Sequence, residues 1–132
     1  MHATLSLPLA PDSSSPAIAR SRAAAFVAPW ASEHLATRLN LLVSEIVTNA
    51  VVHGGSSIHL ELDVLTAYSV RVEVFDGSFD LPEMQTLPPE SESGRGLHLV
   101  DALANEWGAR ERVDGKVVWF ELHDEASETR AG

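Results

Sequence analysis

Apolar residues recur at steps of three and four between positions 35 and 51, which is the spacing of one face of a helix. This pattern predicts a long helix from Leu35 to about His53. Gly54 and Gly55 follow directly, and glycine is the usual residue in the left-handed position that ends a helix. We therefore expect the helix to stop at this pair.

Another helix is expected nearer the N-terminus. Ser15 and Pro16 form a typical helix start, in which a capping residue is followed by proline in the first turn. The predicted helix runs from Ala17 to about Ala28, and Pro29 ends it. The residues expected on its inward side are Ile18, Ala25, Phe26 and Trp30.

Apolar and polar residues alternate in shorter segments, as in strands that cover a core with one face. These segments are residues 3–9, 57–64, 69–75, 108–113 and 116–122. Asp114-Gly115, a strong hairpin signal, joins the last two, and a helix from Leu97 to about Trp107 precedes them. This order predicts one α+β domain, a two-layer sandwich of helices on a mostly antiparallel sheet. The ordered core would span residues 3–122 of the domain 1–132, followed by a polar tail, 123–132.

The charge balance narrows the classes of partner. The chain carries 19 acidic and 9 basic residues, for a net charge of −10. A protein of this charge is repelled by phosphate backbones, so we expect no direct binding to nucleic acid and none to an anionic membrane. The chain has no cysteine, and its first residues lack the basic start of a signal peptide. We expect a soluble, cytoplasmic protein.

Three polar residues interrupt the apolar pattern of the long helix. Glu45, Asn49 and His53 are spaced by four residues, so they share one side of the helix. They could simply face solvent. A carboxylate one turn from a carboxamide also has a chemical use, because the amide oxygen is a hard ligand for Mg²⁺. The carboxylate could then orient or deprotonate a hydroxyl group that attacks a phosphoryl group.

Two further segments are ambiguous in the same way. Asp76-Gly77 follows a predicted strand and could be an ordinary turn, or Asp76 could accept a hydrogen bond from an exocyclic amino group. Gly94-Arg95-Gly96 could merely open the next helix. Alternatively, its backbone N–H groups and the Arg95 guanidinium group could contact phosphates.

Taken together and in order, these segments resemble three sequence boxes of one ATPase superfamily. SEIVTNAVVHGG, at 44–55, is similar to the N box of the GHKL superfamily of gyrase, Hsp90, histidine kinases and MutL proteins. VEVFDGS, at 72–78, resembles its first glycine box, and GRGLHLVDAL, at 94–103, resembles its second. The short length and the ending DGKVVWFEL resemble the branch of anti-sigma-factor serine/threonine kinases, found in short actinobacterial regulators.

The resemblance implies a Bergerat-type ATP-binding fold, with ATP and Mg²⁺ as ligands, and a role for each matching residue. Asn49 would bind Mg²⁺, and Glu45 would be the catalytic base or orienting carboxylate. His53 would line the nucleotide pocket, and Asp76-Gly77 would contact the adenine. The Pro- and Glu-rich segment 80–93 would be the ATP lid. The residues that would meet the phosphates are Gly94, Arg95, Gly96 and Leu97.

The resemblance also implies a function and partners. The chain would be an anti-sigma factor that phosphorylates a serine on a STAS-type anti-sigma antagonist, with homodimerisation common in the branch. An alternative is a non-catalytic module that uses ATP as a switch. The glycines of the broader Asp-x-Gly-x-Gly pattern are absent after Asp76, which motivates this alternative. A third possibility is an α+β domain that binds no nucleotide.

Overall fold

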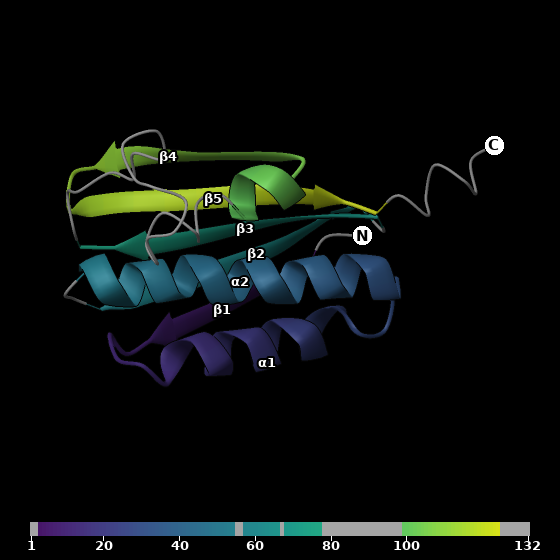
Figure 1. The fold of residues 1–132 in the computed structure, drawn as a ribbon, viewed down its shortest axis with the longest axis horizontal. Helices are drawn as coiled ribbons and strands as arrows, with labels where there is room; N and C mark the ends of the chain where they lie inside the picture. Colours follow the sequence, from purple (N-terminus) through teal and green to yellow (C-terminus); the bar gives the residue numbers. More distant parts are fainter. Residues whose placement is uncertain (1–2, 55–56, 67, 78–98, 125–132) are drawn as a thin grey trace.

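In the computed structural model, two long helices lie against a single antiparallel sheet (Figure 1). The structure describes residues 3–54, 57–66, 68–77 and 99–124. Its elements are β1 (Ala3–Leu9), α1 (Ser15–Val27), α2 (Glu33–Gly54), β2 (Ile58–Thr66), β3 (Ser69–Asp76), β4 (Glu106–Arg112) and β5 (Gly115–His123). The predicted α+β fold is therefore confirmed.

The five strands pair in the order β1-β2-β3-β5-β4, and every pairing is antiparallel. Two hairpins join neighbours in this order, β2 with β3 and β4 with β5. The predicted Asp114-Gly115 turn joins the second hairpin, and Arg112 pairs with Gly115 across it. Because β3 and β5 pair along their whole length, Asp76 at the end of β3 lies beside Lys116 at the start of β5.

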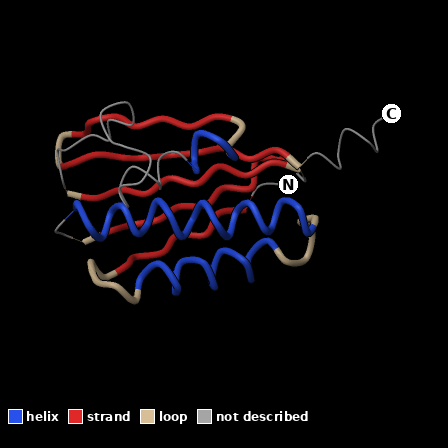
Figure 2. The backbone as a smooth tube through the Cα atoms, in the orientation of Figure 1, coloured by secondary structure: helices blue, strands red, loops and turns tan. Residues whose placement is uncertain are grey.

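The core lies between the sheet and the helices, which cover one face of it (Figure 2). From Ile58 to Val64 in β2, buried and half-buried residues alternate, so alternate side chains point toward the helices. Leu60, Leu62, Val72 and Phe120 are among the fully buried members. The opposite face of the sheet carries charged side chains.

The helix α2 has the length and mean hydropathy of a membrane-spanning segment over Glu33–His53. Many of its apolar residues are buried inside the domain, although Leu41 and Val52 are exposed. Leu35, Leu39, Leu42 and Val43 are all buried in the core cluster. A buried apolar stripe with polar residues at its border is the arrangement of an amphipathic helix packed on the core of a domain.

The inward side predicted for α1 was partly wrong. Ile18 is 47% exposed and Ala25 is also exposed, while Phe26 and Trp30 are partly buried and pack against the core as expected. The buried residues of this helix are Ser15, Ala19, Ala23 and Val27. Small residues on this side let α1 pack closely beside α2, so size rather than hydrophobicity decided which side faces inward.

The helix predicted over Leu97–Trp107 was too long at its C-terminal end. Within the described residues it covers 99–103, and Trp107 belongs to β4. The backbone amide of Asn105 donates to the carbonyl of Glu121, which starts the β4–β5 ladder earlier than expected. The indole N–H of Trp107 donates to Asp101 on the short helix at 2.9 Å, which links the helix to the strand.

The start of α2 is fixed by a side-chain cap that the sequence pattern did not reveal. The Ser32 hydroxyl accepts a hydrogen bond from the Leu35 amide at 3.0 Å and donates to Asp124 Oδ1 at 2.9 Å. The Ser32 amide also donates to Asp124 Oδ2 at 3.3 Å. The buried Asp124 carboxylate therefore lies at the positive end of the helix dipole, where negative charge is stabilising.

Candidate functional site

The predicted polar line on α2 lies at the flank of the helix that faces away from α1. Glu45 and Asn49 are half-buried, and His53 is exposed near the end of the helix. Arg38 precedes Glu45 by seven residues and Asn49 by eleven, so all three share one side. Arg38 donates to the carbonyl of Leu103 from Nη2 at 2.7 Å. Glu45 and Asn49 therefore lie on the side of α2 where the 99–103 helix packs.

Ser44, which directly precedes Glu45 in α2, faces α1 instead. Arg20 of α1 donates to the Ser44 hydroxyl at 3.0 Å, which places Ser44 at the α1–α2 contact. The Thr48 hydroxyl donates to the Ser44 carbonyl at 2.7 Å, so it is satisfied within the helix. Glu45 and Asn49 are thus separated from the α1 contact and border the other flank of α2.

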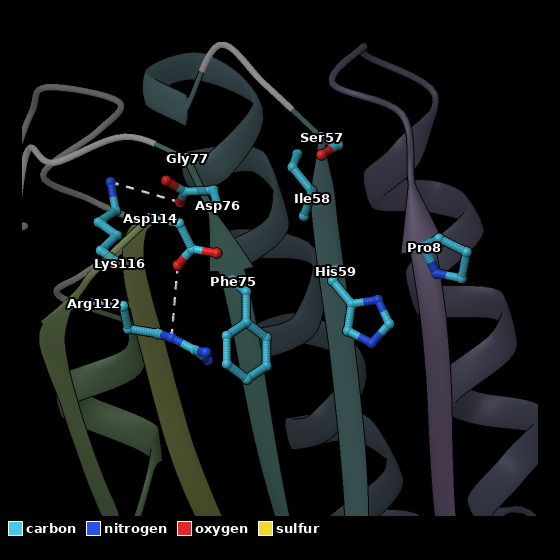
Figure 3. Close-up of a pocket in the computed structure, with 10 residues that line it drawn as sticks. All are labelled: Pro8, Ser57, Ile58, His59, Phe75, Asp76, Gly77, Arg112, Asp114 and Lys116. Atoms are coloured by element: carbon cyan, nitrogen blue, oxygen red, sulfur yellow. Dashed lines mark ion pairs between the residues drawn. The ribbon is translucent and has the colours of Figure 1, made fainter.

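Asp76 ends β3 at the same end of the molecule as the C-terminus of α2 (Figure 1). Its side chain is 1% exposed, and its Oδ2 lies 3.6 Å from Nζ of Lys116, whose side chain is 2% exposed. A lysine this deeply buried is rare without a charge partner. The two groups form a buried ion pair at the ends of adjacent strands (Figure 3).

Gly115 makes this pairing sterically possible. Its φ is +151°, and a Cβ atom there would lie 1.9 Å from the Asp76 carbonyl oxygen and 2.8 Å from the Gly77 Cα. Only glycine lets β5 begin this close to the end of β3. The turn residue predicted from the hairpin signal therefore also sets the position of Asp76.

A pocket of about 640 Å³ opens at this end of the sheet. In it, the Arg112 guanidinium group lies over the Phe75 ring, 4.8 Å from the ring centroid, and its Nε is 3.9 Å from Asp114 Oδ1. The His59 and Phe75 ring centroids are 6.1 Å apart. The lining residues, shown in Figure 3, are Pro8, Ser57, Ile58, His59, Phe75, Asp76, Gly77, Arg112, Asp114 and Lys116.

Asp76 at the pocket, and Glu45 and Asn49 on the flank of α2, carry groups that could serve a purine nucleotide with one divalent cation. Asp76 brings a buried carboxylate acceptor to the pocket wall, which suits an exocyclic amino group. Asn49 offers an amide oxygen of the kind that Mg²⁺ accepts beside substrate phosphates. Glu45, one turn earlier, offers a carboxylate on the same side of α2.

Another acidic group lies on the opposite, open face of the sheet. Carboxylate oxygens of Glu61, Asp63 and Glu73 lie within 4.8 Å of one another. Glu73 is already paired with two cations, Arg71 Nη2 at 3.4 Å and Arg110 Nη2 at 4.0 Å. This group is best explained as a ladder of opposite charges across neighbouring strands.

Comparison with known proteins places this geometry in a family. Residues 7–122 match the family described as the histidine kinase-like ATPase domain. The chain belongs to the histidine kinase-like ATPase family. It is also similar to an uncharacterized protein of Streptomyces coelicolor, with 35% identity over 80 residues, which is 58% of this chain and 76% of that protein.

A solved structure gives the same result. The fold is similar to the histidine kinase domain from the blue-light activated histidine kinase of Erythrobacter litoralis EL346, with a TM-score of 0.55 and 25% identity. The match covers 83% of this chain and 61% of that domain, so the chain spans less than two thirds of its structural relative. Membership of the family supports ATP binding, and the mixed helix-on-sheet fold agrees with it.

The structure brings some predicted site residues to one end and leaves others outside the description. Asp76 and Gly77 line the pocket, and the C-terminus of α2 lies at the same end of the molecule, but no residue of α2 is among those that line the pocket. Asn49 and His53 lie on this C-terminal part of α2. The predicted lid, 80–93, and the phosphate contacts Gly94, Arg95, Gly96 and Leu97 lie outside the described residues.

Sequence reasoning missed two residues that shape this end of the domain. Lys116 could have been found, because it alternates with Val118 and Phe120 and so falls on the buried side of β5. Arg38 carried no such signal. Its importance depends on contacts with Leu103 and Asn105, far along the chain.

Proposed function

We propose that this chain is a cytoplasmic, ATP-dependent regulatory protein, an anti-sigma factor that phosphorylates a serine or threonine of an anti-sigma antagonist. The observation that carries the proposal is the arrangement at the pocket end. A buried carboxylate, Asp76, lies at one wall, and the flank of α2 that carries Glu45 and Asn49 points away from α1. Family membership supports the nucleotide.

In this proposal each residue has one task. Asp76 accepts a hydrogen bond from the adenine amino group, while Asn49 supplies an amide oxygen to Mg²⁺. When bound, Mg²⁺ neutralises charge on the β- and γ-phosphates. Glu45 orients the hydroxyl group of the protein substrate and accepts its proton. The hydroxyl oxygen then bonds to the γ-phosphorus, the bond from that phosphorus to the β–γ bridging oxygen breaks, and ADP leaves.

The charge of the chain supports a basic protein partner. With a net charge of −10, the domain would be attracted to the basic DNA-binding regions of a sigma factor. A STAS-type antagonist would compete with the sigma factor for binding to this chain, and it would receive the phosphoryl group. Homodimerisation is part of the proposal by analogy with the branch, and light scattering at several concentrations would test it.

A first experiment tests nucleotide binding alone. Thermal unfolding is followed with MgATP, MgADP and MgGTP for the wild type and Asn49→Ala. Ligand at about a hundred times its Kd should stabilise the fold by about 2.7 kcal/mol. The proposal predicts an adenine-selective shift that Asn49→Ala abolishes. No shift for the wild type with any nucleotide would contradict it.

A second function, a non-catalytic ATP switch, is motivated by the missing glycines after Asp76. Glu45→Ala separates the two. Under the kinase proposal this variant binds MgATP and the protein partner normally but transfers no labelled phosphate to the antagonist. Under the switch proposal the wild type itself transfers none, and Glu45→Ala changes neither nucleotide nor partner binding.

A further inference from the structure

We infer that Lys116 is a base-reading residue, which acts with Asp76 to recognise the amino group and the adjacent ring nitrogen of adenine. The inference rests on the proposed nucleotide site and names a specificity residue within it. It starts from an ion pair whose two side chains are almost completely buried, 1% and 2% exposed, and both of which line the pocket (Figure 3).

The position of the pair follows from the strand register. Asp76 and Lys116 are direct neighbours across β3 and β5. Lys116 alternates with the core residues Val118 and Phe120, and Asp76 alternates with Val74. Both side chains therefore point to the face of the sheet that the helices cover, which is the face beneath the C-terminal part of α2.

Stability alone is a poor explanation for this pair. Desolvating two charges is expensive, and hydrophobic residues of similar size often serve as well or better in a core. Apolar residues occupy the neighbouring positions on the same face, Val74 before Asp76 in β3 and Val118 after Lys116 in β5. The distance of 3.6 Å between Lys116 Nζ and Asp76 Oδ2 is longer than a direct hydrogen bond, so these two charged atoms lie side by side as an ion pair.

The chemistry of the pair matches one edge of adenine. A carboxylate only accepts hydrogen bonds and an ammonium group only donates them. Adenine presents an amino donor at N6 next to ring acceptors, with N7 on one side and N1 on the other. Asp76 alone can accept a hydrogen bond only from the N6 amino group. Asp76 and Lys116 together can bind the amino donor and, through the Lys116 ammonium group, the ring nitrogen acceptor beside it. In guanine, O6 replaces the amino group and would face the Asp76 carboxylate.

The test compares ATP with analogues that lack one ring nitrogen. Kd values for MgATP, 7-deaza-ATP and 1-deaza-ATP are measured by calorimetry, without any turnover. For the wild type we expect one analogue to bind roughly tenfold to a hundredfold more weakly than ATP, because a hydrogen bond to a charged donor is lost. In Lys116→Met, ATP itself should bind more weakly, and removal of the same nitrogen should cost nothing further.

Arg112→Met is the matched control. It also removes a cation from the pocket lining, but the carboxylate nearest to that cation is Asp114 rather than Asp76. This variant should keep the wild-type ratio of analogue to ATP affinity. Should Lys116→Met fail to fold with Asp76 unbalanced, the double variant Asp76→Asn with Lys116→Met removes both charges and is measured in the same way.

The outcomes separate the inference from the proposed function. If the wild type binds ATP and both analogues equally, or if Lys116→Met keeps the wild-type penalty, Lys116 does not read the base and only the inference fails. If the wild type binds no MgATP, the proposed function and the inference fail together.

Discussion

Arg38 of α2 donates to the carbonyl oxygen of Leu103 through Nη2 at 2.7 Å and through Nε at 3.3 Å. The same guanidinium group donates to Asn105 Oδ1 at 2.9 Å and to the His123 carbonyl at 3.1 Å. One side chain therefore holds the end of the 99–103 helix, the start of β4 and the end of β5 together. This contact fixes the position of the short helix beside the flank that carries Glu45 and Asn49.

Replacing Arg38 should destabilise the domain. Arg38→Ala removes both hydrogen bonds to the part-buried carbonyl of Leu103 and two exposed ones, which should cost about 1–3 kcal/mol in the free energy of unfolding measured with urea. Arg38→Lys should recover little of it, because a single ammonium group cannot match the planar fork of donors. Arg22→Ala, at an exposed position of α1, is the control and should change stability by less than about 0.5 kcal/mol. Equal stabilities for Arg38→Ala and Arg22→Ala would show that the Arg38 contacts contribute nothing.

The cap of α2 predicts a difference between two serines. Ser32→Ala removes the hydroxyl that caps α2 and contacts Asp124, and should cost about 1 kcal/mol. Ser14 occupies the same position in α1 but makes no side-chain cap. Its hydroxyl donates instead to Asp12, which lowers the pKa of that exposed carboxyl. Ser14→Ala should therefore cost clearly less in thermal unfolding, and a larger loss than for Ser32→Ala would contradict this assignment.

The close approach at Gly115 predicts a linked loss of stability and nucleotide binding. In Gly115→Ala, a positive φ is forced on a residue with a side chain, at a cost of about 1–3 kcal/mol, and its Cβ meets the Asp76 backbone. We expect a lower melting temperature and weaker MgATP binding together. In Gly108→Ala the new Cβ meets only the Trp119 side chain, at 2.9 Å. That variant should bind MgATP like the wild type, and a shared binding defect would argue against displacement of Asp76.

The proposed attraction to a basic partner predicts a strong salt dependence of association. Charges separated by more than the Debye length, about 10 Å at 0.1 M salt and about 3 Å at 1 M, are largely screened. The association rate constant with the sigma factor, followed by stopped flow, should fall at least about tenfold between low and high salt. The dissociation rate constant should change much less and serves as the internal control. An association rate that does not respond to salt would count against electrostatic steering.

The local pattern of apolar and polar residues predicted those helices and strands whose buried side consists of large apolar residues. The period of α2 and the alternation in β2, β3 and β5 gave elements within a few residues of those observed. The inward side of α1 was not predictable in this way, because Ala19 and Ala23 are buried for their small size while Ile18 is left exposed. The apolar side of the long helix was predictable from its spacing, and its residues Leu35, Leu39, Leu42 and Val43 belong to the core.

Long-range pairing decided what local patterns missed. The last helix ends at residue 103 because Asn105 and Glu106 pair with β5. Asn105 is hydrogen-bonded to Glu121 and His123, and Glu106 lies opposite Glu121 in the ladder. The helix propensities of residues in this segment do not indicate that it pairs with a strand so far along the chain. The burial of Lys116 follows from the alternation along β5, but its pairing with Asp76 depends on the β3–β5 register, which a single sequence does not specify.

Because the Trp107 indole is hydrogen-bonded to Asp101, the fluorescence of this tryptophan should respond to movement of the 99–103 helix. The three tryptophans sit in separate surroundings. Trp30 packs beside the helices, and Trp119 lies under the Arg71 guanidinium group on the open face, 4.0 Å from it. Of the three, only Trp107 is hydrogen-bonded to the 99–103 helix, which lies in the segment that resembles the second glycine box. With the other two replaced by phenylalanine, the emission of this indole would follow that helix in real time, without any dye attached to the chain.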